Sequence, residues 1–327
     1  MSFGAIVLLA AGAAACDPIP PAPAIVVTTT ASGGDADPGD GLCEMTPGQG
    51  DCSLPAAVDE GNALGRAAIT APAGFYKDMT LVIAGELELN WGHPAGVLLH
   101  GLRVSIEPEA TLRAAGLGFD PAYDELGDGI SVTFSVAGHL ELDHSNVRGI
   151  GLDADGFHET AVHVLPGGST VVTDSIVFGG EHAIHNEGNL VVARSTLLNL
   201  WSGRLNTTGA GASILASTLV QRAVNTSLPT VGCAGTVPTS LGYNYVQTAL
   251  FGCGTQHATD QSGFARVELD AAGTYTIPLT HPGVDAIPLG TLGCTASATD
   301  VVGQPRGIDG NGDGVPGCDI GALERQP

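Results

Sequence analysis

Apolar and polar residues alternate in short runs along much of this chain. The alternation is clear in "LVIAGELEL" from Leu81, "LRVSIEP" from Leu102 and "ISVTFSV" from Ile130. A period of two residues is that of a β-strand with one buried face. No stretch has the 3.6-residue apolar spacing that a helical repeat needs, so the pattern predicts an all-β fold of many short strands.

The same alternation recurs in four related segments. They read "GHLELDHSNV" from Gly138, "GSTVVTDSIV" from Gly168, "GNLVVARSTL" from Gly188 and "AGASILASTL" from Ala210. Each segment carries a serine seven residues after its first residue, with an apolar residue three positions before that serine. The predicted structural ladder is Ser145, Ser175, Ser195 and Ser217, with Leu142, Val172, Val192 and Ile214 facing inward.

A second ladder has the same period of about 20 residues. Its members are His163, His185, Asn206 and Asn225. The one longer interval, between Ser145 and Ser175, is explained by an inserted loop, "GIGLDADGFHE". Two ladders with one period predict a solenoid. A turn of about 20 residues, made of short strands and glycine-rich corners, is typical of a right-handed parallel β-helix of the pectin-lyase-like kind.

The composition fits this fold. Successive turns of a β-helix are joined by backbone hydrogen bonds, so equivalent side chains stack: Val, Leu and Ile inside, Ser, Asn and His at the corners. Glycine fills corners that need a positive φ, which accounts for 48 Gly in 327 residues. The 34 acidic residues against 11 basic ones give a net charge of −23. That charge argues against nucleic acid, anionic membrane surfaces and polyanionic substrates, which need clustered Lys and Arg.

The first residues are typical of an export signal. An apolar run extends from Ala5 to Ala15, too short to span a bilayer, and is followed by Cys16. Small residues before a cysteine resemble a bacterial lipobox, which predicts a lipoprotein-type signal peptide at residues 1–15 and lipidation of Cys16. An ordinary secretory peptide cut near Ala15 is the alternative. Residues 16–42, rich in Pro, Thr, Gly and Asp, are predicted to be a disordered tether.

Six further cysteines support export. Six cysteines allow 15 disulfide connectivities, and their local spacing favours nearest neighbours. The predicted pairs are Cys43 with Cys52, Cys233 with Cys253 and Cys294 with Cys318. None has the CxxC spacing of a zinc site, and disulfides require an oxidising compartment.

Several motifs resemble those of exported bacterial β-helix proteins. "CSLPAAVDEGN" from Cys52 resembles the CSLREA motif, with Pro55 and Ala56 where that motif has Arg and Glu. "GGEHAIHNEGNLVVARSTLLN" from Gly179 resembles the repeat of polymorphic outer-membrane proteins, and "SLGYN" from Ser240 resembles its late part. The ending, "DVVGQPRGIDGNGDGVPGCDIGALE" from Asp300, resembles the C-terminal signature of choice-of-anchor Q proteins.

The resemblance covers most of the chain after residue 43. It implies an N-terminal cap at residues 43–80, a parallel β-helix at 81–250 and a C-terminal cap at 251–327. It also implies an exported protein, either an outer-membrane or cell-surface lipoprotein or a secreted one. It supplies no agreed activity and no catalytic residue.

The stretch "DGNGDGVPGCDIGALE" near the end supports two interpretations. Asp309, Asn311 and Asp313 occupy positions 1, 3 and 5 of an EF-type calcium loop, but the twelfth position is Ile320. The alternative is an acidic turn within a C-terminal lock that caps the solenoid. The predicted members of this lock are Asp300, Arg306, Asp319 and Glu324.

Candidates for catalysis are weaker. Parallel β-helices host polysaccharide lyases and glycoside hydrolases, and the candidates here are Asp174, Glu181 and His182, with Asp153, Asp155 and His158 on the inserted loop. The NTD, DD and RxK signatures of polygalacturonases are absent, so solvated turns are the favoured interpretation of these residues.

The sequence thus predicts a structural, adhesive or surface-binding protein of the cell envelope. A carbohydrate-active β-helix enzyme is the alternative. The expected partners are surface glycans or other envelope components, with no nucleic acid, with the membrane reached only through the lipid anchor, and with a monomeric chain. No cofactor is expected other than calcium at the acidic turn.

Overall fold

The structure is a computed structural model. It describes residues 21–91, 97–118, 132–149, 160–180, 182–199, 203–222, 230–231, 233–247, 250–251, 253, 257–265, 267–269 and 275–327. Several residues singled out from the sequence lie outside these ranges, namely Cys16, Asp153, Asp155, His158, Glu181 and Asn225.

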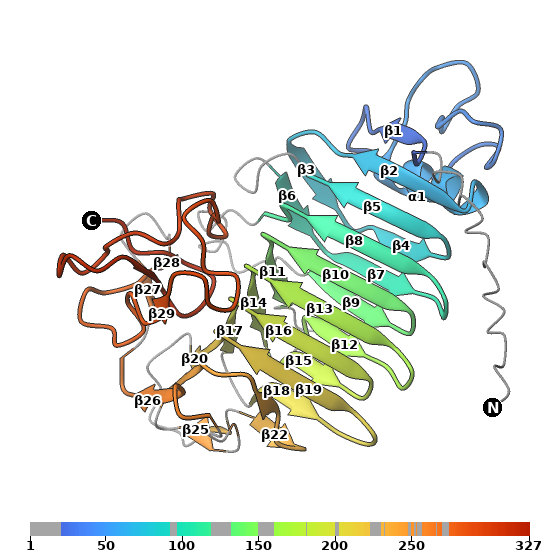
Figure 1. Ribbon diagram of the computed structural model, residues 1–327. Coiled ribbons are helices and arrows are strands. Elements are labelled where there is room, and N and C mark those ends of the chain that lie inside the picture. The colour runs from blue at the N-terminus through green and yellow to red at the C-terminus, as the bar shows by residue number, and fades with distance from the viewer. Residues whose placement is uncertain are drawn as a thin grey trace, which may run out of the picture.

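Short parallel strands stack in three walls, which confirms the predicted parallel β-helix (Figure 1). Each turn passes through wall A, then wall B, then wall C. Wall A contains β1 (Ala24–Val26), β2 (Arg66–Thr70), β5 (Glu86–Asn90), β8 (Thr111–Ala115), β10 (His139–Asp143), β13 (Ser169–Thr173), β16 (Asn189–Ala193), β19 (Ala212–Ala216) and β23 (Thr239–Ser240).

The other two walls are built in the same way. Wall B contains β11 (Asn146–Gly149), β14 (Ile176–Gly179), β17 (Thr196–Asn199), β20 (Leu219–Arg222), β24 (Tyr245–Gln247) and β26 (Gln261–Gly263); earlier in the chain, β3 (Gly74–Lys77) and β6 (Val97–His100) form a separate parallel pair between strands of walls A and C. Wall C contains β4 (Thr80–Ile83), β7 (Leu102–Ile106), β9 (Val132–Val136), β12 (Val162–Val164), β15 (His182–Asn186), β18 (Gly203–Thr207) and β22 (Cys233–Gly235). Two-residue strands pair outside the walls: β21 (Thr230–Val231) with β25 (Leu250–Phe251), β27 (Glu268–Leu269) with β28 (Tyr275–Thr276), and β29 (Ile287–Pro288) with β30 (Gly317–Cys318).

A ladder of buried hydroxyl groups forms the corner between walls A and B. Ser145, Ser175 and Ser195 stack there and are all fully buried. Each hydroxyl donates to the backbone carbonyl two residues earlier, at 2.6 to 2.8 Å. Ser175 Oγ also accepts the N–H of Ser145 at 3.0 Å, and Ser195 Oγ accepts the N–H of Ser175 at 3.2 Å. The corner therefore satisfies its own buried polar groups.

The fourth member of this ladder is Thr218, which corrects the prediction of Ser217. β19 pairs with β16 so that Leu215 lies beside Val192 and Ala216 beside Ala193. Leu215 is therefore the core residue, and Ile214 is half-buried on the outer face. A slip of one residue moves a side chain to the opposite face. The sequence did not reveal this slip, because Ile214 and Leu215 are both apolar.

The ladder of histidine and asparagine lies on the outer face of wall C. His163 pairs with His185, and His185 pairs with Asn206. The residue paired with Asn206 on the next strand is Ala234.

The N-terminal part of the described chain is folded, which corrects the predicted tether for residues 21–42. β1 pairs in parallel with β2, and Val27 after it is buried. β2 already belongs to wall A, so the solenoid begins at Arg66 rather than at Leu81.

The helix α1 (Leu54–Ala63) covers the open end of the first turn. Ser53 caps it by accepting the N–H of Ala56 at 3.0 Å, and a proline lies in its first turn. Glu60 of this helix is buried and accepts the backbone N–H groups of Gly39 and Gly41. These bonds tie the segment before residue 43 to the helix, so both parts form the N-terminal cap.

The C-terminal segment packs against the side of the solenoid rather than on its last turn (Figure 1). Outer residues of wall B form a second core with this segment. Its main members are Ile176, Phe178, Leu198 and Leu219 from the wall, with Val284, Ile287, Val301, Ile320 and Leu323 from the segment. The four residues of β14 are all buried, as expected of a strand covered on both faces. The predicted end cap is thus a cover for wall B.

Three disulfides form between the cysteine pairs predicted from their spacing. They join Cys43 to Cys52, Cys233 to Cys253 and Cys294 to Cys318. The second bond links neighbouring turns, and the third lies within the C-terminal segment.

A substitution in the core tests the register of wall A. Val192 is fully buried, whereas its neighbour Val191 is half-buried on the outer face of the same strand. Val192→Asp places a carboxylate in the core and is expected to lower the free energy of unfolding by about 4 kcal/mol or more. The matched control Val191→Asp is expected to fold, as measured by circular dichroism and urea unfolding. Equal losses in both variants would refute the assigned register.

Candidate functional site

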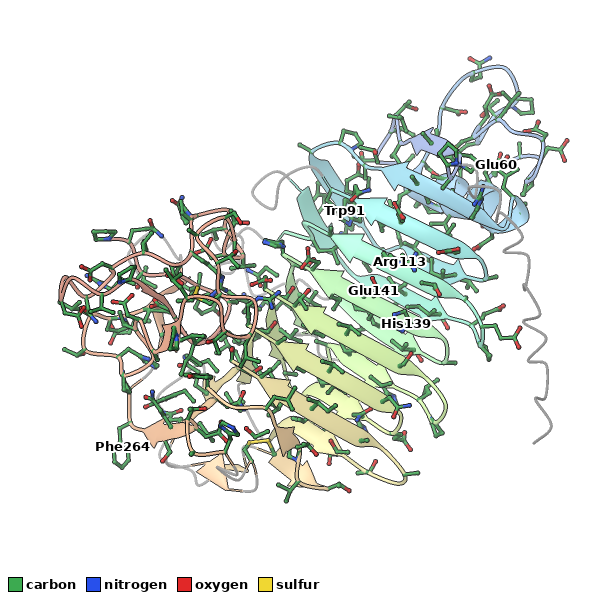
Figure 2. All side chains as sticks on the ribbon, in the orientation of Figure 1. Glu60, Trp91, Arg113, His139, Glu141 and Phe264 are labelled. Atoms are coloured by element: carbon green, nitrogen blue, oxygen red, sulfur yellow. A yellow bond between two sulfur atoms is a disulfide. The ribbon has the colours of Figure 1, made fainter. Side chains whose placement is uncertain are left out.

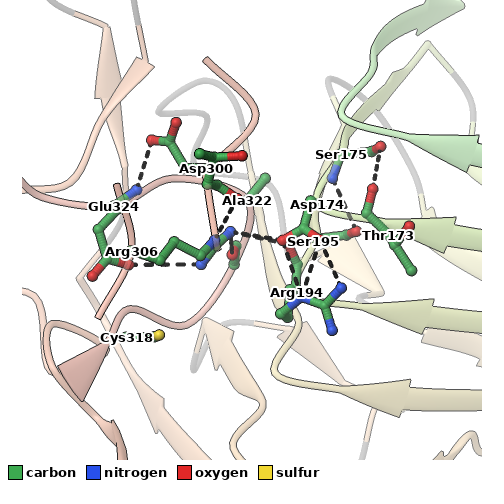
Figure 3. A network of polar contacts seen from close by, with 12 residues as sticks. Thr173, Asp174, Ser175, Arg194, Ser195, Asp300, Arg306, Cys318, Ala322 and Glu324 are labelled. Atoms are coloured by element: carbon green, nitrogen blue, oxygen red, sulfur yellow. Dashed lines mark hydrogen bonds and ion pairs between the residues drawn. The ribbon is translucent and has the colours of Figure 1, made fainter. Parts of the chain in front are cut away.

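Asp174, one of the weak catalytic candidates, is enclosed by two arginines. It lies at the corner of walls A and B and is only 4% exposed. Arg194 of the next turn donates from Nε to both carboxylate oxygens at 3.0 Å and from Nη2 at 2.7 Å. Nη2 of Arg306 reaches the same carboxylate at 3.3 Å (Figure 3). Because these contacts leave no open face toward a substrate, Asp174 has a structural role.

Arg306 joins the C-terminal segment to the solenoid through this carboxylate. Its side chain is fully buried, and Nη1 lies 3.7 Å from a carboxylate oxygen of Glu324. The guanidinium also donates to the backbone carbonyl groups of Gly321 at 2.8 Å and Thr299 at 3.3 Å. The guanidinium thus divides its donors between the C-terminal segment and Asp174 of the solenoid.

The other acids of the predicted lock bind backbone N–H groups. Asp300 accepts from Val302, Gln304 and Glu324 at 2.7 to 3.0 Å. Asp319 accepts from Asp285 at 2.8 Å and from Arg325 at 2.7 Å. These bonds fold the C-terminal segment onto itself around the guanidinium of Arg306.

This network contains more carboxyl groups than guanidinium groups. Burial, followed by the nearby charge of Asp319, raises the pKa of Glu324 to about 8. Burial also raises the pKa of Asp319, to about 6, and that of Asp300. In each case removal from water disfavours the charged carboxylate. Glu324 is therefore protonated for much of the neutral range.

The acidic turn at residues 309–315 is closed by its own side chains. Asp309 accepts backbone N–H groups from Gly312, Asp313 and Gly314, at 2.7 to 3.1 Å. Asn311 accepts from the N–H of Asp313 at 2.8 Å. This geometry shapes the turn, and calcium binding at Asp309, Asn311 and Asp313 stays a prediction.

An open groove of about 340 Å³ crosses wall C. It runs over β4, β7, β9 and β12, so it follows the solenoid axis across consecutive turns. Five of its nine described lining residues carry hydroxyl groups, together with one arginine and one histidine, although most of the lining surface is apolar. The residues are Thr80, Arg103, Val104, Ser105, Thr133, Phe134, Ser135, Thr160 and His163.

A histidine cluster adjoins this groove on the same wall. The rings of His163 and His185 are stacked, with centroids 4.6 Å apart and planes 13° apart. His163 Nε2 lies 2.9 Å from a carboxylate oxygen of Glu187, which follows β15. His182, another weak catalytic candidate, stands edge-on to His185 with centroids 5.8 Å apart. Stacked turns thus gather residues that are 24 positions or fewer apart in the chain.

A chain of polar contacts crosses the outer face of wall A (Figure 2). Ser169 Oγ lies 2.7 Å from His139 Nδ1, and His139 Nε2 lies 3.0 Å from Glu141. Arg113 then bridges Glu141 at 3.3 Å and Glu86 at 2.6 Å. None of these residues lines the groove on wall C or a second groove beside the N-terminal cap. The side chains of His139, Glu141 and Arg113 are 31 to 40% exposed on the outer face of wall A.

Several of these residues were missed by reasoning from the sequence. His139, Ser169, Glu187 and Arg194 make close contacts in the three clusters, but the repeat pattern did not mark them as functional. A strand register would have found the first two, because His139 and Ser169 hold the same position in β10 and β13. Trp91, an aromatic residue that could otherwise bind a sugar ring, is buried against Tyr76 (Figure 2).

The fold defines a disulfide-bonded parallel β-helix. No family model, curated protein or solved structure matches the chain. The resemblance to choice-of-anchor Q and CSLREA-domain proteins therefore stays a prediction. Within the described ranges, no helix is both long enough and apolar enough to cross a membrane.

Removing Arg306 tests whether the C-terminal network stabilises the fold. Arg306→Ala leaves Asp174 and Glu324 buried with one cation fewer and is expected to cost about 3 kcal/mol or more in unfolding free energy. The matched control is Arg113→Ala, since Arg113 also contacts two carboxylates but is 40% exposed. That control should cost at most about 1 kcal/mol. Urea unfolding measures both, and equal losses would contradict a stabilising role for burial of Arg306.

The raised pKa of Glu324 predicts a pH-dependent stability. A carboxyl group whose pKa rises from 4.5 to about 8 binds its proton more tightly in the folded chain. Stability from this group is therefore full below pH 4.5 and is lost as the pH rises toward 8. The melting temperature of Glu324→Gln should decrease less between pH 5 and pH 8 than that of the wild type.

His281 gives the opposite dependence, because burial lowers its pKa from 6.5 to about 4. The stability that depends on neutral His281 is lost as the pH falls from 6.5 to about 4. His281 is present in both proteins, so the difference between their melting curves isolates Glu324. Parallel curves across this range would show that Glu324 stays ionised.

Proposed function

We propose that this protein is a secreted or envelope-anchored β-helix with a structural, adhesive or surface-binding role, and that wall C contacts its ligand. The observation that carries the proposal is the groove across this wall, whose described lining holds hydroxyl groups but no carboxylate. Serine and threonine hydroxyls both donate and accept hydrogen bonds, which suits the hydroxyl groups of a glycan. A groove along the solenoid axis suits an extended polymer.

The lining argues for binding rather than cleavage of glycosidic bonds. Glycoside hydrolysis uses two carboxyl groups, about 5 to 9.5 Å apart, on either side of the bond that is broken. Among the described lining residues, Arg103 and His163 are the ionisable ones, and neither is an acid. Asp174, the buried candidate acid, lies instead at the corner of walls A and B.

The proposed location rests on the cysteines and on the N-terminal sequence. Three disulfides are typical of proteins that fold in an oxidising compartment outside the cytosol. The apolar run before Cys16 supports export by a signal peptide. The motif resemblance to choice-of-anchor Q proteins supports association with the cell envelope.

A carbohydrate-active enzyme is the second candidate, and the polar chain on wall A favours it. If His139 Nε2 carries the proton that is shared with Glu141, then Nδ1 accepts the hydroxyl proton of Ser169. This arrangement activates a serine for attack on an ester carbonyl, such as an acyl group on a glycan. Ser169 does not line the groove on wall C, which is the proposed contact surface.

A panel of immobilised glycans tests the proposal. Ser135→Trp fills the middle of the groove and is expected to weaken glycan binding at least tenfold. Thr70→Trp adds the same bulk to an exposed position of wall A away from His139 and is the matched control, expected to bind like the wild type. Equal binding by both variants would show that the groove is not the contact surface.

The same panel separates the second candidate. Released acyl groups and shortened chains are measured for the wild type and for Ser169→Ala. Turnover that Ser169→Ala abolishes, with binding unaffected by Ser135→Trp, would replace the binding proposal with an enzymatic one.

A further inference from the structure

Three groups of potential metal ligands occur among the described residues. They are His163 with His185 and Glu187, Asp143 with His144 and Asp174, and Asp285 with Asp319 and Glu324. In each group the ligand atoms lie within 4.8 Å of one another. They differ in what already surrounds those atoms.

The second and third groups are occupied by protein contacts. Asp174 is bound by Arg194 and Arg306, which would repel a cation from its carboxylate. In the third group, Asp285 accepts the N–H groups of Gly310 and Asn311. Asp319 and Glu324 of that group are buried beside Arg306. Neither group leaves its carboxylates free for a metal ion.

The first group has the composition and the exposure of a metal site. It combines two imidazoles and one carboxylate, and all three residues are half-buried on the outer face of wall C. The stacked rings come from adjacent strands, so the backbone register holds both imidazoles on one face. Glu187 approaches from the turn after β15, with an oxygen 2.9 Å from His163 Nε2.

We propose that His163, His185 and Glu187 bind one divalent transition-metal ion of the zinc type. Two imidazole nitrogens and a carboxylate oxygen are ligands that zinc accepts at about 2.0 to 2.2 Å, which places ligand atoms roughly 3.3 Å apart in a tetrahedron. The two rings lie nearly parallel, 13° apart, so metal binding requires them to turn until one nitrogen of each points at the ion. Metal binding replaces the hydrogen bond between His163 and Glu187 with bonds to the ion, and it displaces Thr208 Oγ1, which lies 3.1 Å from His185 Nε2, where that nitrogen is the ligand.

His163 belongs to both features, so the proposed metal site adjoins the groove. Three protein ligands and one open position are the arrangement in which zinc also holds water or a ligand oxygen. The net charge of −23 raises the local concentration of cations near the surface. The metal site does not depend on the proposed glycan binding and goes beyond it.

The neighbouring turn supplies a variant that the fold already accepts. Asn206 holds the position of His163 and His185 on the next strand. His163→Asn and His185→Asn therefore remove an imidazole without introducing a residue foreign to this row. His139→Asn is the matched control, because His139 also contacts a glutamate, at 3.0 Å, but has no second histidine stacked against it.

Equilibrium dialysis of the metal-stripped, folded protein against Zn²⁺ tests the proposal. We expect one zinc ion per chain for the wild type and for His139→Asn, and at least tenfold weaker binding for His163→Asn, His185→Asn and Glu187→Gln. Cobalt substitution should give the visible absorption of a tetrahedral site in the wild type, and both histidine variants should lose it. Calcium, which prefers oxygen ligands, should not compete.

Two results would overturn the assignment. One is an unchanged zinc stoichiometry in both histidine variants, which would place any bound zinc elsewhere. The other is the absence of zinc binding by the wild type, which would leave the row as a hydrogen-bonded ladder. Circular dichroism of each variant confirms that the β-helix is intact in these comparisons.

Discussion

Backbone hydrogen bonding between successive turns is the interaction on which the rest of the structure depends. Parallel strands in register place equivalent residues beside one another, so each position must accept a neighbour roughly 4.8 Å away. The hydroxyl corner meets this requirement by passing hydrogen bonds from Ser145 to Ser175 and on to Ser195. The same spacing sets His163 against His185. The chemically interesting clusters are therefore products of stacking between turns rather than of short sequence motifs.

The three walls differ in what covers their outer faces. Wall B is apolar outside and is covered by the C-terminal segment, which forms a second core there. Wall A carries a chain of charged and polar residues around Arg113 and His139. Wall C carries the groove and the histidine cluster. The backbone is similar in all three walls. The outward-facing side chains therefore decide whether a wall is exposed to solvent, as walls A and C are, or covered by the C-terminal segment, as wall B is.

Much of the fold could be predicted from the sequence, because a solenoid repeats its signals. The alternating strands, the spacing of Ser145, Ser175 and Ser195, and the three disulfides were all predicted correctly. The slip at Ser217 was not foreseen, since two adjacent apolar residues satisfy either register. The φ of Ser217 is positive, at 53°, and those of Asp174 and Arg194 are positive too. This backbone property cannot be read from the sequence.

The contacts of Arg306 could not be predicted for a different reason. Its partner Asp174 is far away in the chain, and the two meet only because the C-terminal segment turns back along wall B. A pattern of local residues identifies the acids of the lock but not the surface against which they fold. The buried outer face of β14 was the available signal, since strand residues without alternation indicate cover on both sides.

The route of the C-terminal segment determines when, during folding, the turns of the solenoid become one cooperative unit. In an ordinary solenoid each turn contacts only its neighbours, so turns form and fray almost independently. Here residues 299–322 contact successive turns at His144, Asp174, Thr196 and Ser217. During synthesis from the N-terminus, these turns can stack early. The contacts from residues 299–322, which bind several turns at once, form only after those residues have been synthesised. The final stretch of the chain thus converts a row of separable turns into one unit that opens all together.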